Sequence, residues 1–212
     1  MDLPTLYFSA DMSAFTASSR IASTRFGLST EEVEQVMEAG GPLRDELLAD
    51  LAESKITFSF GSPIRWQQVD EELQAYVELW NAYPQVMVFD NLMDFEDAES
   101  DYSAQMEVMQ MLTELARETG STVIVMHHAS DKQMDPRNPW KPPSRNEIKG
   151  GLSEKPELGL TVALNSVSLD FNVAVVKQRM GPQDPPAERW VTLRCEPEFT
   201  RFHARGLGGV PK

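Results

Sequence analysis

The 212-residue sequence has little cysteine, few basic residues and no long apolar run. Its one cysteine, Cys195, excludes an intramolecular disulfide and is typical of a protein from a reducing compartment. No stretch approaches the roughly 20 apolar residues that a membrane-spanning helix needs. The first eight residues show neither a basic segment nor a long apolar one, so no signal peptide is expected. These absences predict a soluble cytoplasmic protein with no membrane partner.

Basic residues are outnumbered, with 33 acidic against 19 basic side chains and a net charge of -14. This balance disfavours an extended phosphate-binding surface on the chain. It does not exclude nucleic acid, because a ring-shaped enzyme can place a few basic loops in its channel while its outer surface stays acidic.

The sequence also lacks a phosphate-binding loop. That loop requires the pattern G-x-x-x-x-G-K-S/T, because backbone N–H groups and the lysine surround the phosphates. None of the 12 glycines is followed directly by lysine. We therefore expect no such phosphate cradle within these 212 residues.

Apolar strands alternate with amphipathic helices up to about residue 126, and a run of strands follows. This order predicts an α/β fold, a mainly parallel sheet flanked by helices with antiparallel strands at the C-terminal end. We expect one domain over residues 1–205 and a tail over 206–212. Strands are expected at residues 6–9, 56–60, 86–89, 123–126, 160–164, 169–176, 189–194 and 199–203. Helices are expected at residues 13–26, 29–40, 42–51, 69–81 and 106–119.

A carboxylate ends one of the apolar strands. Residues 86–89 are continuously apolar, as in a parallel strand covered on both faces, and Asp90 follows directly. Ligands of open α/β sheets bind at the carboxyl ends of strands, and an aspartate there suits the coordination of Mg²⁺. Asp94 and Asp97 follow in an acidic, loop-like segment. A second interpretation is a DNA nuclease in which Asp90, Asp94 and Asp97 bind the catalytic metal, but the segment that contains Asp94 and Asp97 is better explained as a solvated turn.

Two histidines, His127 and His128, follow the next apolar strand. Adjacent residues of a strand point to opposite faces, and no second set of metal-binding side chains with suitable spacing lies nearby. A zinc site is therefore not expected. One of the two histidines is either a polar sensor beside a nucleotide phosphate or a strand-end residue whose hydrogen bonds are made with neighbouring loops.

Two cations close a later apolar strand. Lys177 and Arg179 stand at positions i and i+2, which share one face of a strand, and the turn residues Gly181 and Pro182 follow. Two like charges on an exposed face favour an anion, and the planar fork of arginine matches phosphate. The alternative is a solvated edge strand whose charges prevent association.

Four motifs, taken in order, resemble those of RecA/DnaB-like P-loop ATPases. They are Phe8–Ser13, Asp90 as the Walker B aspartate, His128 as a polar sensor, and Lys177–Pro182. The last is similar to a Lys-x-Arg-x-Gly-Pro element of DnaB-type helicases that the RadA repair ATPases share in shorter form. Together with the glycine-rich segment 149–152, these motifs are most similar to the DnaB/RecA-like ATPases of actinobacterial phages. The resemblance covers nearly the whole chain and implies a RecA-like core.

The resemblance also implies a role for each motif residue. Asp11 would orient or activate the attacking water, a role that glutamate usually has in the family. Asp90 would hold Mg²⁺ through water, and His128 would report the γ-phosphate to the loop beyond it. Lys177 and Arg179 would reach the nucleotide of a neighbouring subunit as an arginine finger supplied in trans.

The polar, proline-containing segment over residues 130–149 is long for a connection in a compact domain, and such loops are functional or disordered. The resemblance makes Arg145 and Lys149, near its end, candidates to face DNA in the channel of a ring.

The resemblance implies an ATP- and Mg²⁺-dependent helicase or translocase. It would act on single-stranded or forked DNA in replication, recombination or repair, in the cytoplasm of a phage-infected bacterial host. Without a phosphate-binding loop, the isolated chain is expected to be inactive. It would form a homo-oligomeric ring or a hetero-oligomer with a P-loop-bearing subunit. The remaining alternative is a degenerate interaction subunit without catalysis.

Overall fold

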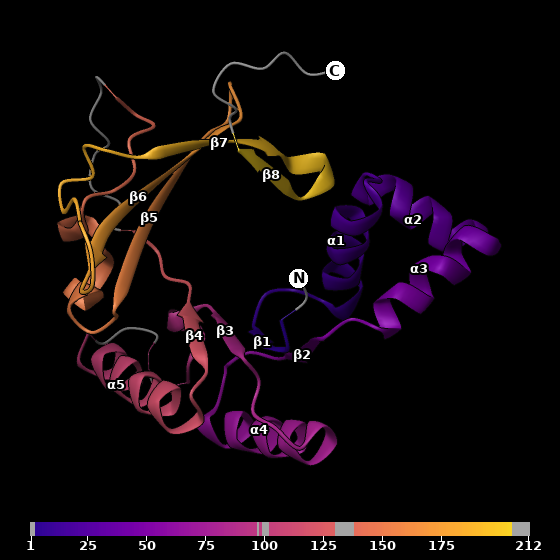
Figure 1. Ribbon diagram of the computed structural model, residues 1–212, viewed down its shortest axis with the longest axis horizontal. Coiled ribbons are helices and arrows are strands. Elements are labelled where there is room, and N and C mark those ends of the chain that lie inside the picture. Colours follow the sequence, from indigo (N-terminus) through magenta and orange to yellow (C-terminus); the bar gives the residue numbers. More distant parts are fainter. Residues whose placement is uncertain (1–2, 97, 99–101, 130–137, 205–212) are drawn as a thin grey trace. The chain divides into compact units, whose positions relative to one another are not determined.

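The computed structural model describes residues 3–96, 98, 102–129 and 138–204 (Figure 1). The chain divides into two compact units, Met1–Ile21 with Gln35–His128, and Ala22–Glu34 with Ala129–Lys212. One four-stranded sheet lies in each unit. The tail expected over 206–212 is outside the described residues, and a single domain over 1–205 stays a prediction.

The first unit contains a parallel sheet with the strand order β2-β1-β3-β4. Its strands are β1 (Thr5–Ser9), β2 (Ile56–Phe60), β3 (Val86–Asp90) and β4 (Thr122–Val125). The central strand β1 pairs in register with both neighbours, so that Ser9 lies level with Phe60 and with Asp90. The predicted parallel sheet is confirmed.

Five α-helices occupy the segments in which the sequence predicts helices. They are α1 (Ala14–Phe26), α2 (Thr30–Ala39), α3 (Pro42–Ala52), α4 (Trp66–Trp80) and α5 (Tyr102–Thr119). Helix α2 begins with a reciprocal cap, in which the Glu32 N–H donates to Ser29 Oγ at 3.2 Å and the Ser29 N–H donates to Glu32 Oε2 at 2.7 Å. Within the described part of the chain, no helix is long and apolar enough to cross a membrane.

Residues of β1 and β3 contribute to the core of the first unit. Leu6, Phe8, Met87 and Phe89 are fully buried, and the rings of Phe8 and Phe89 stack with their centroids 4.8 Å apart. Helices α4 and α5 run along the same side of the sheet (Figure 1). Ser59 joins β2 to α4, because its hydroxyl lies 2.9 Å from side-chain atoms of that helix. The core therefore holds rigidly the two strands that end at the candidate site.

Phe89→Ala should lower the free energy of unfolding by about 3–5 kcal/mol, because it removes a fully buried ring and leaves a cavity. Urea denaturation measures the loss. Phe15→Ala is the matched control, because Phe15 is 53% exposed and its removal should change stability by less than about 1 kcal/mol. Equal effects of the two substitutions would contradict the core assignment.

Strand β4 is less buried than its apolar sequence predicts. It lies at the edge of the parallel sheet, and Ile124 and Met126 are 42% and 44% exposed. Val123 and Val125, which alternate with them, are partly buried. The buried strand that this apolar run indicates is therefore only partly covered, because one apolar side faces solvent among the described residues.

The second unit contains an antiparallel sheet in chain order, β5-β6-β7-β8. Its strands are β5 (Leu158–Asn165), β6 (Asp170–Gln178), β7 (Val191–Glu196) and β8 (Arg201–Ala204). Two 3₁₀ helices precede it, η2 (Arg145–Glu147) and η3 (Lys149–Glu154). The antiparallel C-terminal strands are confirmed, and they form a sheet of their own. Cys195 on β7 is buried, as expected of a structural thiol.

A β-bulge interrupts the pairing of β5 with β6. Gly159 pairs with Lys177, whereas the next residue, Leu160, pairs with Val175, so that Val176 is an extra residue on β6. A bulge reverses the alternation of side chains beyond it. Val176 and Lys177 are consequently both buried, although they are neighbours in sequence.

Candidate functional site

The ends of β1 and β3 bring two acidic residues to one edge of the parallel sheet. Ser9 and Asp90 are paired, and the N–H of Ala10 donates to the carbonyl of Asp90 at 3.1 Å. Asp11 follows one residue later and is exposed. Asp90 therefore lies at the carboxyl edge of the sheet, and Asp11 follows the strand beside it.

The end of β4 brings the histidines to the same edge. The N–H of Met126 donates to the carbonyl of Phe89 at 3.0 Å, and the carbonyl of Met126 accepts from the N–H of Leu92 at 3.0 Å. His127 and His128 follow directly, and His128 is exposed. His128 therefore follows the end of β4, the strand adjacent to the one that carries Asp90.

Tyr7 is a site residue that the sequence analysis did not identify. Its hydroxyl donates to Asp90 Oδ2 at 3.0 Å and so holds the carboxylate in one orientation. Burial raises the pKa of Tyr7 far above its usual value, and the charge of Asp90 and its hydrogen bond add to this. The sequence gives part of the signal: Tyr7 lies two residues before Ser9, and residues two apart share a face of the sheet, but the pairing of Ser9 with Asp90 comes from the structure.

Tyr7→Phe should remove a loss of stability at alkaline pH. The pKa of Tyr7 is raised in the folded state above its ordinary value of 10.0, so above that pH the unfolded chain releases a proton that the folded chain keeps. Stability should therefore fall by at most about 1.4 kcal/mol per pH unit above pH ~10 in the parent, and less in the variant. Urea denaturation between pH 8 and pH 11 measures the difference.

Tyr83→Phe is the control for this experiment, because Tyr83 is exposed. The parent and the Tyr83 variant should show the same dependence on pH. An unchanged alkaline dependence in the Tyr7 variant would contradict the assigned contact with Asp90.

Asp94, the second carboxylate of the nuclease interpretation, has a local structural role. Its Oδ2 accepts from the N–H of Asn91 at 3.1 Å, while Asn91 Oδ1 accepts from the N–H of Met93 at 2.8 Å, a reciprocal cap of the helix η1 (Leu92–Asp94). Asp97, the third carboxylate, lies outside the described residues. Among those described, no three histidine, cysteine, aspartate or glutamate side chains are grouped to hold a metal ion. The nuclease alternative stays untested.

The cations of the second unit differ in exposure. The expectation of an exposed pair is wrong for Lys177, which is 6% exposed, because the bulge turns it to the buried face of β6. Its Nζ donates to the carbonyl of Glu154. Arg179 is half exposed and lies 2.7 Å from Glu157. Lys177 is therefore buried and Arg179 is half exposed, although they are only two residues apart in the sequence.

Arg145 belongs to the same group of cations. Burial lowers the pKa of Lys177, and the positive charges of Arg179 and Arg145 lower it further. Arg145 Nε donates to Ser153 Oγ at 3.1 Å. Lys149 begins η3, but its side chain lies outside what the structure describes. The structure thus groups three cations that the sequence analysis assigned to two functions.

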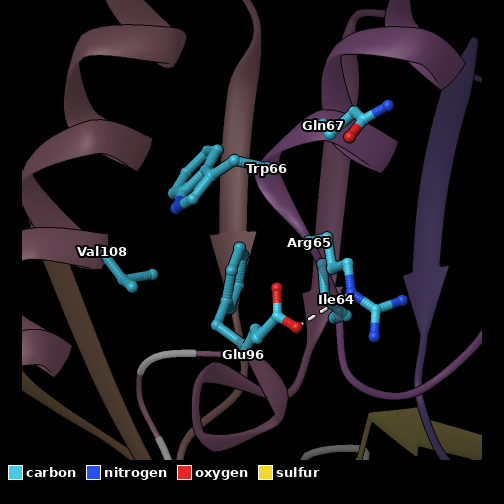
Figure 2. Close-up of a pocket in the computed structure, with 7 residues that line it drawn as sticks. Ile64, Arg65, Trp66, Gln67, Glu96 and Val108 are labelled. Atoms are coloured by element: carbon cyan, nitrogen blue, oxygen red, sulfur yellow. Dashed lines mark hydrogen bonds and ion pairs between the residues drawn. The ribbon is translucent and has the colours of Figure 1, made fainter.

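A hollow of about 210 Å³ lies elsewhere in the first unit (Figure 2). Arg65 Nε and Glu96 Oε1, which lie 3.0 Å apart, form an ion pair in the lining of this hollow. The ring centroids of Trp66 and Phe95 lie 5.2 Å apart. Its lining consists of Ile64, Arg65, Trp66, Gln67, Phe95, Glu96 and Val108. This lining includes none of the residues that the sequence predicts for the site.

Comparison with known sequences identifies the family, although no family model matches the chain. The Gene 65 protein of Mycobacterium phage L5 is 33% identical over 200 residues, which are 90% of this chain and 72% of that protein. The Gene 65 protein of Mycobacterium phage D29 is 32% identical over 198 residues, 90% of this chain and 84% of that protein. The chain belongs to the Gene 65 protein family of mycobacteriophages. The phage relationship expected from the motifs is confirmed.

Solved structures give the fold of this Gene 65 family member. The ATPase domain of G40P matches with a TM-score of 0.78 at 15% identity, over 97% of this chain and 75% of that domain. A DnaB-like replicative helicase matches with a TM-score of 0.76 at 14% identity, in a structure that also concerns its interactions with primase. The match covers 95% of this chain and 52% of that helicase chain. The KaiC-like protein PH0186 from Pyrococcus horikoshii OT3 matches with a TM-score of 0.54 at 16% identity. The match covers 96% of this chain and 76% of that protein. The fold is that of RecA/DnaB-like ATPase domains.

Proposed function

We propose that this chain is the RecA-type core of a DNA-dependent ATPase of the helicase or translocase class, acting in DNA replication, recombination or repair. One observation carries the proposal. Asp90 ends β3, and Asp11 and His128 follow the ends of its neighbours β1 and β4, at the edge where sheets of such a DnaB-like ATPase fold bind ligands.

The carboxyl edge of the first unit fits a magnesium ion. Mg²⁺ is bound through one or two carboxylates together with waters and phosphate oxygens, so a compact three-ligand cluster is not required. Asp90 offers a carboxylate that Tyr7 orients from the neighbouring strand. Asp11 would orient the attacking water, and His128 would contact the phosphate end of the nucleotide. A bound Mg²⁺ would supply charge stabilisation of the phosphates.

The phosphate cradle of an ATP site does not fit the residues present. No glycine of the sequence precedes a lysine, so the N–H nest and the lysine of a P-loop have no counterpart. A quarter of the G40P ATPase domain also lies outside the match. The exposed apolar side of β4, with Ile124 and Met126, is a surface that a further structural element would cover. We therefore propose that a P-loop-bearing partner completes the ATP site.

The second unit would serve a neighbouring subunit. Arg179 is half exposed and can leave its ion pair with Glu157 at little cost, since surface ion pairs contribute about 0–1 kcal/mol. It would act with Lys177 as a finger supplied in trans, in a homo-oligomeric ring or a hetero-oligomer. The distance of this pair from Asp90 within one chain stays a prediction.

Single-stranded or forked DNA would be the nucleic-acid partner. The net charge of -14 restricts DNA contacts to a few basic side chains. Lys149, at the end of the segment that follows the sensor strand, is the remaining candidate for a DNA contact. Arg145 is instead bound to Ser153.

Hydrolysis of ATP stimulated by single-stranded DNA tests this function, with the chain and its P-loop-bearing partner both present. Asp90→Asn should abolish the stimulated rate, whereas Asp45→Asn, on the exposed surface of α3, should retain it. Metal-dependent cleavage of forked DNA without nucleotide would support the nuclease alternative. An assembly that binds its partner and shows neither activity would support a non-catalytic interaction subunit.

A further inference from the structure

One short segment contacts both cations of the Lys177–Arg179 pair. The segment Ser153–Glu157 contains the last two residues of η3 and the three residues before β5, and its Glu154 carbonyl accepts from Lys177 Nζ. The N–H of Arg179 donates to the carbonyl of Glu157 at 3.1 Å, and Arg179 Nη1 lies 2.7 Å from Glu157 Oε1. The positions of both charged groups therefore depend on where this segment lies.

Arg145 fixes the beginning of that segment. Its Nε donates to the hydroxyl of Ser153 at 3.1 Å, and Ser153 is buried. The N–H of Arg145 donates to the carbonyl of Pro185, at 2.8 Å, in the loop that follows β6. Arg145 thus connects the segment Ser153–Glu157, which contacts the two cations, with the loop that follows β6.

The charges around Lys177 explain why its ammonium needs such a support. Lys177 has a long flexible stem, and two like charges, Arg179 and Arg145, surround it together with the carboxylates of Glu154 and Glu157. A buried ammonium beside guanidinium groups is unfavourable unless oxygen atoms are held within reach of it. The Glu154 carbonyl is such an atom, and Arg145 holds its neighbour, Ser153.

We propose that Arg145 positions the Lys177–Arg179 pair through Ser153 and the segment Ser153–Glu157, in place of the DNA contact expected from the sequence. The use of the pair on a neighbouring nucleotide rests on the proposed function. The positioning itself concerns this chain alone and is tested without ATP.

The first experiment measures the rate at which an amine-acylating reagent modifies Lys177 in the full chain, by mass spectrometry, with the exposed Lys55 as internal reference. Arg145→Lys and Ser153→Ala keep the positive charge near Lys177, and each should raise the rate at Lys177 about tenfold, because each removes the bond that holds the segment. Arg189→Gln is the matched control, since Arg189 is highly exposed and lies 3.9 Å from Asp184. It should leave the rate unchanged.

Ser153→Ala keeps every charge and removes one hydroxyl, so it tests the position even where an Arg145 variant folds poorly. Unchanged protection of Lys177 in Ser153→Ala and in a folded Arg145 variant would overturn the proposal, whatever the outcome of any ATPase assay. Circular dichroism confirms that each variant is folded.

The second experiment separates positioning from DNA contact in the assembly with the P-loop-bearing partner. Arg145→Lys keeps the positive charge that a phosphate contact needs. It loses the guanidinium Nε that donates to Ser153, because lysine carries a single ammonium group instead of a planar guanidinium. We expect kcat to fall about tenfold, with the DNA concentration for half-maximal stimulation unchanged. Retained kcat in Arg145→Lys, with a raised DNA requirement in Arg145→Gln, would overturn the proposal in favour of DNA binding. If no assembly hydrolyses ATP, the proposed function fails, while the labelling result still decides the positioning.

Discussion

The purified 212-residue chain should neither bind Mg²⁺-ATP at micromolar concentrations nor hydrolyse it. Phosphate binding in P-loop ATPases comes from a nest of backbone N–H groups, a helix N-terminus and one lysine, which have no counterpart in this sequence. Asp11 and Asp90 alone repel a polyanion. Arg179 does not compensate in this prediction, because it serves the neighbouring subunit. Isothermal titration calorimetry with Mg²⁺-ATP measures the binding.

Addition of a P-loop-bearing partner should restore both binding and DNA-stimulated hydrolysis. Asp90→Ala in the restored assembly is the control, and it should abolish hydrolysis. Micromolar affinity of the lone chain for Mg²⁺-ATP, lost in Asp90→Ala, would contradict the prediction. In that case the chain would hold the nucleotide by residues other than a P-loop.

Arg179→Ala should reduce ATP turnover of the assembly by about 10³–10⁵-fold, the range that arginine fingers contribute to phosphoryl transfer. Stability should change by less than about 1 kcal/mol, since the side chain is half exposed and pairs with Glu157 at the surface. Steady-state hydrolysis and urea denaturation measure the two quantities. Arg189→Ala removes an equal charge from the exposed surface of the same unit and should retain turnover.

Mixing two inactive variants tests whether the finger acts in trans. Asp90→Ala and Arg179→Ala chains in one assembly produce some interfaces at which an intact Asp90 meets an intact Arg179 from the neighbour. Part of the turnover should return in the mixture. Turnover that stays absent, while the mixed assembly forms, would assign Arg179 to the site of its own chain.

The parallel sheet could be predicted because its signals are local. The continuously apolar residues 86–89 are long enough for a strand and too short for a helix, and Asp90 follows them directly. Parallel strands that are connected by helices end at one edge, so the placement of Asp11, Asp90 and His128 at that edge follows from the alternation of strands and helices along the chain. The reciprocal cap of Ser29 and Glu32 could likewise be predicted from residue spacing.

The contact of Tyr7 with Asp90 could be predicted only in part. Both residues lie on one face once β1 and β3 are paired, but the sequence does not state which strands are neighbours. The exposure of Ile124 on β4, and of Met126 directly after it, has the same origin. An apolar run indicates a strand, whereas its place at the edge of a sheet depends on the order of all strands.

Residue type and spacing within single segments are enough to predict the α/β class, the parallel strands, the acidic edge and the lack of a phosphate-binding loop in this sequence. The surroundings of the cations depend instead on tertiary packing. Simple alternation placed Lys177 with Arg179 on an exposed face, but the bulge at Val176 reverses the alternation and buries Lys177. The approach of Arg145 to Lys177 depends on the packing of segments distant in sequence, and no local pattern encodes such a contact.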